Sequence, residues 1–202
     1  MLKQKEEKEL EIEAFAVKNT EESQRNASSS GGVFIALANQ VIEEGGVVCG
    51  AKFDKDFHLI HDFAQTKEEL KPLMGSKYLQ SDMKDCYKKV KNYLLQERLV
   101  LFVGTPCQVM GLKLYLRKEY DNLLAVEVVC HGVPSPLVWE KYLEEVCKRK
   151  KISLNEIKNI SFRNKDKSWR VFNLKIEGKD KTILKESLHD NLYMRGFLQN
   201  LF

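Results

Sequence analysis

The chain has 202 residues, of which 43% are hydrophobic, so it is long enough and apolar enough to bury the core of a globular domain. The net charge is only +4, because 33 basic residues are interleaved with 29 acidic ones, and we therefore expect no nucleic-acid partner. No apolar run reaches the roughly 20 residues that span a bilayer, so we expect a cytoplasmic protein with no membrane span.

Two short basic runs, Lys148–Lys151 and Arg163–Arg170, stand out against this balance. We interpret most of the charge as solvated helix faces, with local binding of an anion or cofactor as the alternative.

The first third of the chain is predicted to contain short elements joined by polar turns. These are a charged helical lead-in (2–11), a strand (11–19), a polar loop (20–32), a helix (33–44), a strand (47–54), its hairpin partner (57–66), a short helix (67–72) and a loop (74–82). The helix over 33–44 is expected to end at the glycine pair that follows it.

The middle of the chain has the pattern of a parallel βαβ unit. Asp82 is predicted to cap a helix over 83–97. A continuously apolar strand (99–103), an amphipathic helix (106–118) and a second buried strand (123–129) follow it.

The last third is predicted to begin with a helix over 136–150 and to continue with antiparallel strands over 157–164, 168–177 and 181–187. A final apolar helical pattern begins at Asp190. The predicted fold is therefore α/β, with a mixed sheet that has a parallel βαβ core and with a C-terminal antiparallel β segment.

The turn between the first buried strand and its helix contains a cysteine. Thr105 fits the N-cap, Pro106 the first helical position and Gln108 the third position after the cap, which together predict a capping box. Cys107 then lies in the first turn of the helix, where free N–H groups and the helix dipole favour a thiolate. A thiolate serves either as a nucleophile or as a ligand for iron or zinc.

Cys130 follows the second strand of the same unit. Because parallel strands end at the same edge of a sheet, Cys107 and Cys130 are expected to share the edge where open α/β sheets bind ligands. We favour a functional role for this pair over simple packing. Cys49, Cys86 and Cys147 are predicted to be packing residues.

The segment "SSSGG" at 28–32 precedes a helix, and its hydroxyls and backbone N–H groups are suited to hold a phosphate. The segment "GSKY" at 75–78 is a candidate to add a lysine to the same anion. His131 is interpreted as a base, a metal ligand or a turn residue, whereas the other histidines, His58, His61 and His189, are interpreted as surface or core residues.

Five motifs in this order, "SSSGGVFIALA", "GGVVCGAKFD", "GSKYLQSD", "LFVGTPCQVMGLK" and "VCHGVPSPLVWEKYL", resemble the beta-subunit family of coenzyme F420 hydrogenases and dehydrogenases, as does the later "ISFRNKDKSW". The resemblance extends from about Glu13 to the C-terminus. It implies an iron–sulfur flavoprotein with FAD and a 4Fe–4S cluster, which passes electrons to or from coenzyme F420 or another small acceptor. A redox partner subunit or a ferredoxin is the implied protein partner.

The resemblance also implies roles for individual residues. Cys107 and Cys130 would be cluster ligands, and the predicted cofactor-binding residues are Ser28, Ser29, Ser30, Gly31, Gly32, Ser76, Lys77, Gly104, Thr105 and His131. No catalytic residue is assigned. The family's N-terminal region (1–150) would bind flavin and cluster, and residues 151–202 would begin its C-terminal region.

The sequence departs from the family in its cysteines. Many members begin with a CxxCxxC segment, and members usually continue into a CxxC segment beyond the position of Phe202; the chain has neither. Two thiolates leave a four-cysteine site incomplete, so we expect either a truncated chain or a relative that has lost the cluster.

Two other classes of function stay open at this point. One is a thiol-dependent transferase or hydrolase with Cys107 as nucleophile and His131 as base. The other is a non-catalytic scaffold subunit whose cysteines are inert.

Overall fold

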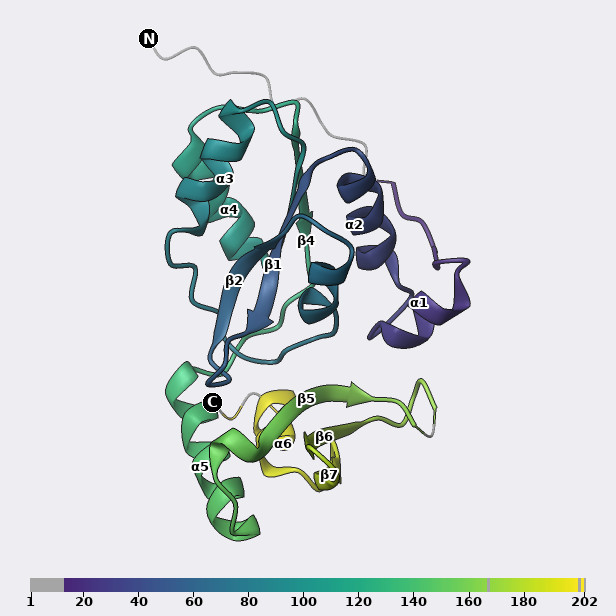
Figure 1. Cartoon of the computed structure of the whole chain (residues 1–202), viewed down its shortest axis with the longest axis vertical. Helices are drawn as coiled ribbons and strands as arrows, with labels where there is room; N and C mark the ends of the chain where they lie inside the picture. Colours follow the sequence, from purple (N-terminus) through teal and green to yellow (C-terminus); the bar gives the residue numbers. More distant parts are fainter. Residues whose placement is uncertain (1–12, 167, 200, 202) are drawn as a thin grey trace.

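The computed structural model describes residues 13–166, 168–199 and 201 (Figure 1). The predicted helical lead-in over 2–11 lies outside these residues. In the described part of the chain, a four-stranded sheet and a three-stranded sheet lie one beyond the other, with helices packed on each.

The first sheet has the strand order β2-β1-β3-β4. Its strands are β1 (Val47–Phe53), β2 (Leu59–Ala64), β3 (Val100–Gly104) and β4 (Leu123–Glu127). β1 and β2 form the predicted antiparallel hairpin, whereas β1–β3 and β3–β4 are parallel pairs. This confirms the mixed sheet with a parallel βαβ core.

Helices cover both faces of the first sheet, as Figure 1 shows. On one face, α2 (Val33–Glu43) and the 3₁₀ helix η1 (Glu68–Leu73) pack in one apolar cluster. On the other face, α3 (Cys86–Leu95) and α4 (Pro106–Leu116) pack in a second cluster. β3 lies between the two layers, which explains why its sequence is continuously apolar.

The prediction that residues 123–129 form a buried strand is wrong in one respect. β4 pairs only with β3 in the first sheet, so it is an edge strand, and its residues are half-buried or exposed. The side chain of Leu124 is 38% exposed.

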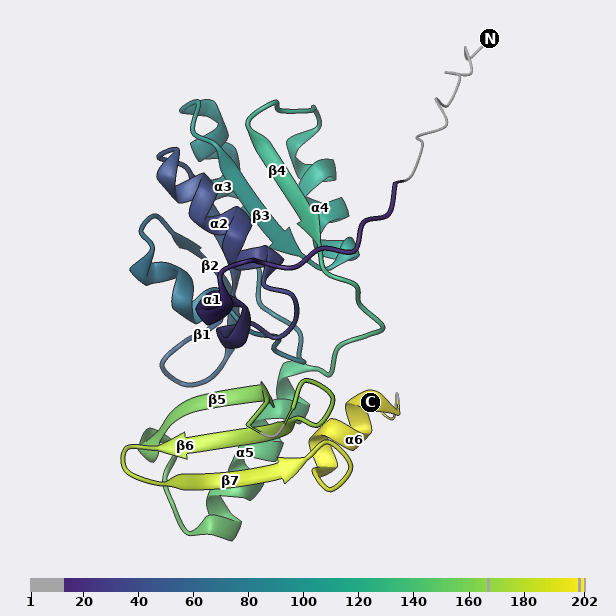
Figure 2. The same ribbon diagram turned by 90° about the vertical axis from the view of Figure 1, so that its right-hand side faces the viewer.

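The second sheet is antiparallel, with the order β5-β6-β7. Its strands are β5 (Ile157–Asn164), β6 (Asn173–Gly178) and β7 (Thr182–Ser187). The helix α5 (Pro136–Lys150) and the short helix α6 (Leu192–Leu198) pack on this sheet, and the 3₁₀ turn η2 (Leu154–Glu156) leads into it (Figure 2). The predicted antiparallel β segment is confirmed.

One apolar cluster joins the two sheets. The buried ring of Trp139 on α5 stacks on Phe53 of β1, with 5.9 Å between ring centroids, and lies 5.2 Å from the ring of Phe162 on β5. Its indole N–H donates a hydrogen bond to the carbonyl of Phe57 in the β1–β2 turn. Because α5 packs in this shared cluster, a boundary between two regions at residue 150 stays a prediction.

The N-terminal predictions fail in two places. Residues 13–19 form no strand; Phe15 and Val17 are 75% and 64% exposed, so alternation there does not reflect a buried face. A short helix, α1 (Glu22–Ala27), lies within the predicted polar loop. Glu22 in its first turn and Arg25 in its last turn both complement the helix dipole.

The predicted helix ends are partly correct. α2 ends before Gly45, which has a φ of +73°, and a Cβ at Gly46 would lie 2.7 Å from the carbonyl oxygen of Leu99. Asp82, however, does not cap α3. Its carboxylate accepts the N–H of Lys84 instead, and the helix begins after Asp85.

In the described part of the chain, no helix has the length and apolar character needed to cross a membrane.

Candidate functional site

The turn from β3 into α4, Gly104–Gln108, is called the Cys107 turn below. The predicted capping box is present: the N–H of Thr105 donates to the side-chain oxygen of Gln108 at 3.0 Å, and Pro106 begins α4. Cys107 is exposed in the first turn, and its sulfur lies 3.1 Å from the hydroxyl oxygen of Thr105. A Cβ on Gly104 would come within 3.1 Å of the Gln108 side chain, so a larger residue there would have to displace Gln108.

Cys130 lies at the same edge of the first sheet. Gly104 and Glu127 are directly paired across β3 and β4, and the N–H of Val128 donates to the carbonyl of Gly104 at 2.8 Å. Cys107 and Cys130 each follow this pair by three residues, and both are exposed. The shared edge is therefore present, whereas the role of the two thiols as metal ligands stays a prediction.

A buried hydrogen-bond network connects the Cys107 turn to β2 and to the loop 74–82. The ring of His61 on β2 bonds through Nε2 to the carbonyl of Val103 at 3.1 Å and through Nδ1 to the hydroxyl of Ser81 at 2.8 Å. The side-chain amide of Gln108 donates to the same hydroxyl at 2.8 Å. Burial lowers the pKa of His61, which favours the neutral ring.

The predicted phosphate-binding segments lie side by side. The hydroxyl of Ser29 accepts the backbone N–H of Ser76 at 2.7 Å, so Ser28–Gly32 and the loop 74–82 are in direct contact. Gly31 and Gly32 are packed against residues 17–19, because an added Cβ on Gly31 would lie 3.0 Å from the carbonyl oxygen of Val17. Gly32 adopts a φ of +78° at the N-cap of α2, where glycine is least strained.

The ammonium of Lys77 is held by backbone carbonyls of neighbouring elements. Its ammonium donates to the carbonyls of Ala51, Pro72 and Met74 at 2.8–2.9 Å. These bonds use the three donors of an ammonium group. Burial lowers the pKa of Lys77 to about 7. In this arrangement Lys77 ties the loop 74–82 to β1 and η1, and its contact with a phosphate stays a prediction.

A pocket of about 320 Å³ opens beside Ser28 and Ser29, and we call it the anion pocket. It is lined by Asn26, Ala27, Ser28, Ser29, Gly75, Ser161, Arg163, Asn164, Lys165 and Asp166. The residues come from α1 and the segment after it, from loop 74–82, and from the end of β5, so the pocket lies between the two sheets.

Two cations line the anion pocket, Arg163 and Lys165, and the sequence indicated only the basic run to which both belong. The Nε atom of Arg163 is buried and has no hydrogen-bond partner within the described residues, although the guanidinium lies over the ring of Phe172. Lys165 donates to the carbonyl of Ser28 and lies 3.4 Å from the ring centre of Trp169. Burial and, secondly, the charge of Arg163 lower the pKa of Lys165.

The carboxylate of Asp166 also lines the pocket, but it is paired with Lys185 at 2.7 Å. The remaining positive charge favours an anionic ligand, because an anion would offset the repulsion between Arg163 and Lys165. The signal in the sequence was the basic run Arg163–Arg170. It did not indicate which of its residues would face Ser28 and Ser29, because that depends on how β5 packs against the first sheet.

His131, a predicted cofactor-binding residue, has its ring 4.5 Å from that of Phe197 on α6. This contact is compatible with a turn residue packed on α6. A role of His131 as a base for Cys107 stays a prediction.

The remaining cysteines pack as expected. Cys49 and Cys86 are buried with their sulfur atoms 3.0 Å apart, and Cys147 is half-buried. Burial, together with the neighbouring Cys86 thiol, raises the pKa of Cys49 well above its usual range. Both sulfur atoms therefore belong to the core between β1 and α3.

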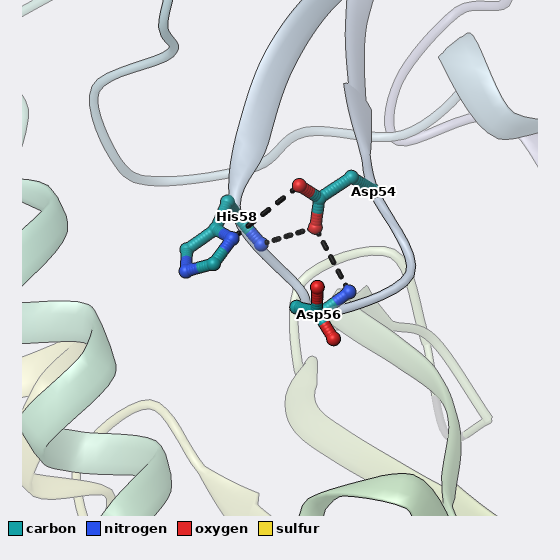
Figure 3. Close-up of side chains that lie close together, drawn as sticks. All are labelled: Asp54, Asp56 and His58. Carbon is teal, nitrogen blue, oxygen red and sulfur yellow. Dashed lines mark hydrogen bonds and ion pairs between the residues drawn. The ribbon is translucent and has the colours of Figure 1, made fainter.

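The β1–β2 turn gathers Asp54, Asp56 and His58 (Figure 3). One carboxylate oxygen of Asp54 accepts the backbone N–H groups of Asp56 and His58, both at 2.9 Å, and the other lies 3.3 Å from the His58 ring. These bonds stabilise the turn, and they account for the cluster without a metal ion.

The fold and site thus define an α/β protein with two exposed thiols at the carboxyl edge of its parallel strands and a basic pocket between its sheets. Residues 97–196 match the family of coenzyme F420 hydrogenase/dehydrogenase beta subunits, over the part of the family described as its C terminus. This match, over just under half of the chain, is to the family that the motifs predicted.

Among solved structures, the chain is similar to a chain in "Xenon derivatization of the F420-reducing [NiFe] hydrogenase complex from Methanosarcina barkeri", with 18% identity and a TM-score of 0.55. The match covers 85% of this chain and 59% of that chain. At this identity the likeness shows a shared fold. No curated protein sequence gives a significant match.

Proposed function

We propose that this protein is an electron-transfer component that binds a flavin nucleotide, FAD, with its phosphates in the anion pocket. The electrons would pass between an iron–sulfur cluster and coenzyme F420 or a related small acceptor. The family and the F420-reducing complex of the structural relative support this proposal. A redox partner subunit or ferredoxin, and a cytoplasmic location, complete the proposal.

The observation that carries the proposal is the chemistry of the anion pocket. A phosphate needs several N–H and O–H donors and a compensating positive charge. Arg163 offers a buried Nε donor that has no partner among the described residues, Lys165 adds a second cation, and Ser29 adds a hydroxyl, whereas the hydroxyl of Ser28 donates to the carbonyl of Gln24. A bound flavin would supply one- and two-electron chemistry, and these residues would hold and orient it.

The cysteines fit a cluster only in part. A 4Fe–4S cluster takes four cysteine thiolates, and within the described residues only Cys107 and Cys130 are exposed. These two residues would contribute two ligands at the edge of the first sheet. The other two ligands would have to come from a further chain segment or from a partner.

Flavin binding is tested with Arg163→Ala. Loss of one charge-assisted hydrogen bond, about 1.5–3 kcal/mol, should weaken the FAD affinity roughly 10- to 100-fold in a fluorescence titration. The matched control is Arg170→Ala, because Arg170 belongs to the same basic run but does not line the pocket. An unchanged affinity in Arg163→Ala, or equal losses in both variants, would contradict the assignment.

The cluster is tested by anaerobic reconstitution with iron and sulfide in the presence of the segment or partner that supplies the other two ligands, followed by metal analysis. Cys107→Ser and Cys130→Ser should each lower the bound iron by at least half, whereas Cys147→Ser should not, because Cys147 lies on α5 and packs against the apolar cluster that joins the two sheets. Equal iron content in all three variants would exclude a cluster at this edge.

A further inference from the structure

The loop 74–82 contacts each part of the candidate site. Ser76 bonds to Ser29 beside the anion pocket, and the N–H of Gln80 donates to the carbonyl of Pro134, four residues after Cys130, at 3.0 Å. Ser81, at the end of the loop, is buried and reaches the side chain of Gln108 in the Cys107 turn.

The hydrogen bonds around Ser81 allow one self-consistent arrangement for a neutral His61 ring. The carbonyl of Val103 can only accept, so Nε2 of His61 must carry the proton. Nδ1 of the neutral ring must then accept, and the hydroxyl of Ser81 donates to it.

The same arrangement continues into the Cys107 turn. The oxygen of Ser81 is left to accept from the side-chain amide of Gln108. The other end of that amide, its carbonyl oxygen, is therefore directed at the N–H of Thr105, two residues before Cys107. Each hydrogen bond in this series then joins one donor to one acceptor, as buried polar groups require.

We propose that Ser81 and His61 are positioning residues, which hold the Cys107 turn through Gln108 and so keep the Cys107 sulfur beside the Thr105 hydroxyl and the first turn of α4. The importance of this positioning for electron transfer rests on the proposed function, in which Cys107 is a cluster ligand. The positioning itself is a property of the chain alone.

Ser81→Ala removes the hydroxyl that joins His61 to Gln108. The variant leaves His61 Nδ1 and the Gln108 amide without their shared partner in a buried place, and both groups must then shift to find new ones. A shifted Gln108 no longer holds Thr105. The sulfur of Cys107 is then no longer held beside the hydroxyl of Thr105, and its surroundings change.

The test measures the alkylation of Cys107 by iodoacetamide in the purified chain before any iron or flavin is added, with Cys130 as the internal reference. In Ser81→Ala, the ratio of the Cys107 rate to the Cys130 rate should change at least threefold, because the Cys107 sulfur is no longer held beside Thr105. Ser81→Thr, which keeps a hydroxyl, should restore most of the ratio. Ser187→Ala, which removes a hydroxyl bonded to Asp190 on the second sheet, should leave the ratio unchanged.

An unchanged ratio in Ser81→Ala would overturn the proposal. So would an equal change in the alkylation rates of both cysteines, because that would indicate a general loss of structure. Because no cofactor is present, such a result would leave flavin and cluster binding untouched, and the failure of either of those would leave this result untouched.

A measurement on the wild-type chain covers the case in which Ser81→Ala does not fold. Nitrogen-15 NMR of the histidine rings should show His61 neutral near pH 7, with Nε2 protonated and Nδ1 as a hydrogen-bond acceptor. A His61 ring with its proton on Nδ1 would overturn the arrangement, because Nε2 would then lack a proton to donate to Val103.

Discussion

The Cys107 turn and the anion pocket are built in different ways. The turn uses consecutive residues, Gly104–Gln108, whose capping box forms within a single helical turn. The pocket needs Ser28 and Lys165, which are 137 residues apart in the chain and are linked by a hydrogen bond. The backbone at the start of α4 is therefore set mainly by neighbouring residues and is completed by one tertiary contact, between Gln108 and Ser81, whereas the basic pocket forms only where distant segments pack together.

The largest expected effect is on the packing that holds the two sheets together. Trp139→Ala should lower the free energy of unfolding by about 3–5 kcal/mol, as measured by urea denaturation, because a fully buried indole and its contacts with Phe53 and Phe162 are lost. It should weaken FAD binding as well, since the pocket residues of β5 would lose their support.

Trp139→Phe serves as the graded control, because it keeps an aromatic ring and loses the hydrogen bond to Phe57. The comparison between the two regions would fail if Trp139→Ala left FAD binding intact but changed the reactivity of Cys107.

Lys77 gives a pH-dependent test of tertiary structure. Burial lowers its pKa to about 7 from the ordinary 10.5, so the unfolded chain binds more protons at this residue between these two pH values. Its contribution to the free energy of unfolding should therefore rise as the pH increases from 7 to 10.5, by at most about 1.4 kcal/mol per pH unit.

The measurement is the difference in unfolding free energy between wild-type and Lys77→Met chains across this pH range. Cysteine and tyrosine groups titrate in both chains, so their contributions cancel in this difference. The stability of the wild-type chain relative to the variant should increase with pH. A difference that does not depend on pH would show that the three carbonyl hydrogen bonds offset the effect of burial on the pKa of Lys77.

The smallest expected effect is at the Cys107 turn. Thr105→Ala removes the N-cap side chain of α4 and should cost about 1 kcal/mol in urea denaturation. Ser135→Ala, at the similar cap-and-proline start of α5, should cost a comparable amount, because Ser135 accepts the N–H of Val138. A loss in Thr105→Ala as large as that in Trp139→Ala would show that the turn is not a local structure.

Particular elements show where prediction from the sequence succeeds. β3 was predicted because five consecutive apolar residues bounded by a glycine suit a strand covered on both faces. β4 was predicted as a strand but not as an edge strand, since the same apolar sequence pattern occurs in half-exposed and in buried strands. Residues 13–19 alternate in polarity, yet they form no strand, because an alternating segment becomes a strand only where a neighbouring strand pairs with it.

The sequence by itself determined the local features: the parallel βαβ unit, the capping box at Thr105, the shared edge of Cys107 and Cys130, and the family. These follow from spacing, backbone preference and the direction of parallel strands, which act over a few residues or one crossover. Only the tertiary structure decided that Arg163 and Lys165 face Ser28, that Lys77 is held by three carbonyls, and that Ser81 joins His61 to Gln108. Such contacts join distant segments, and they depend on the packing of the whole core.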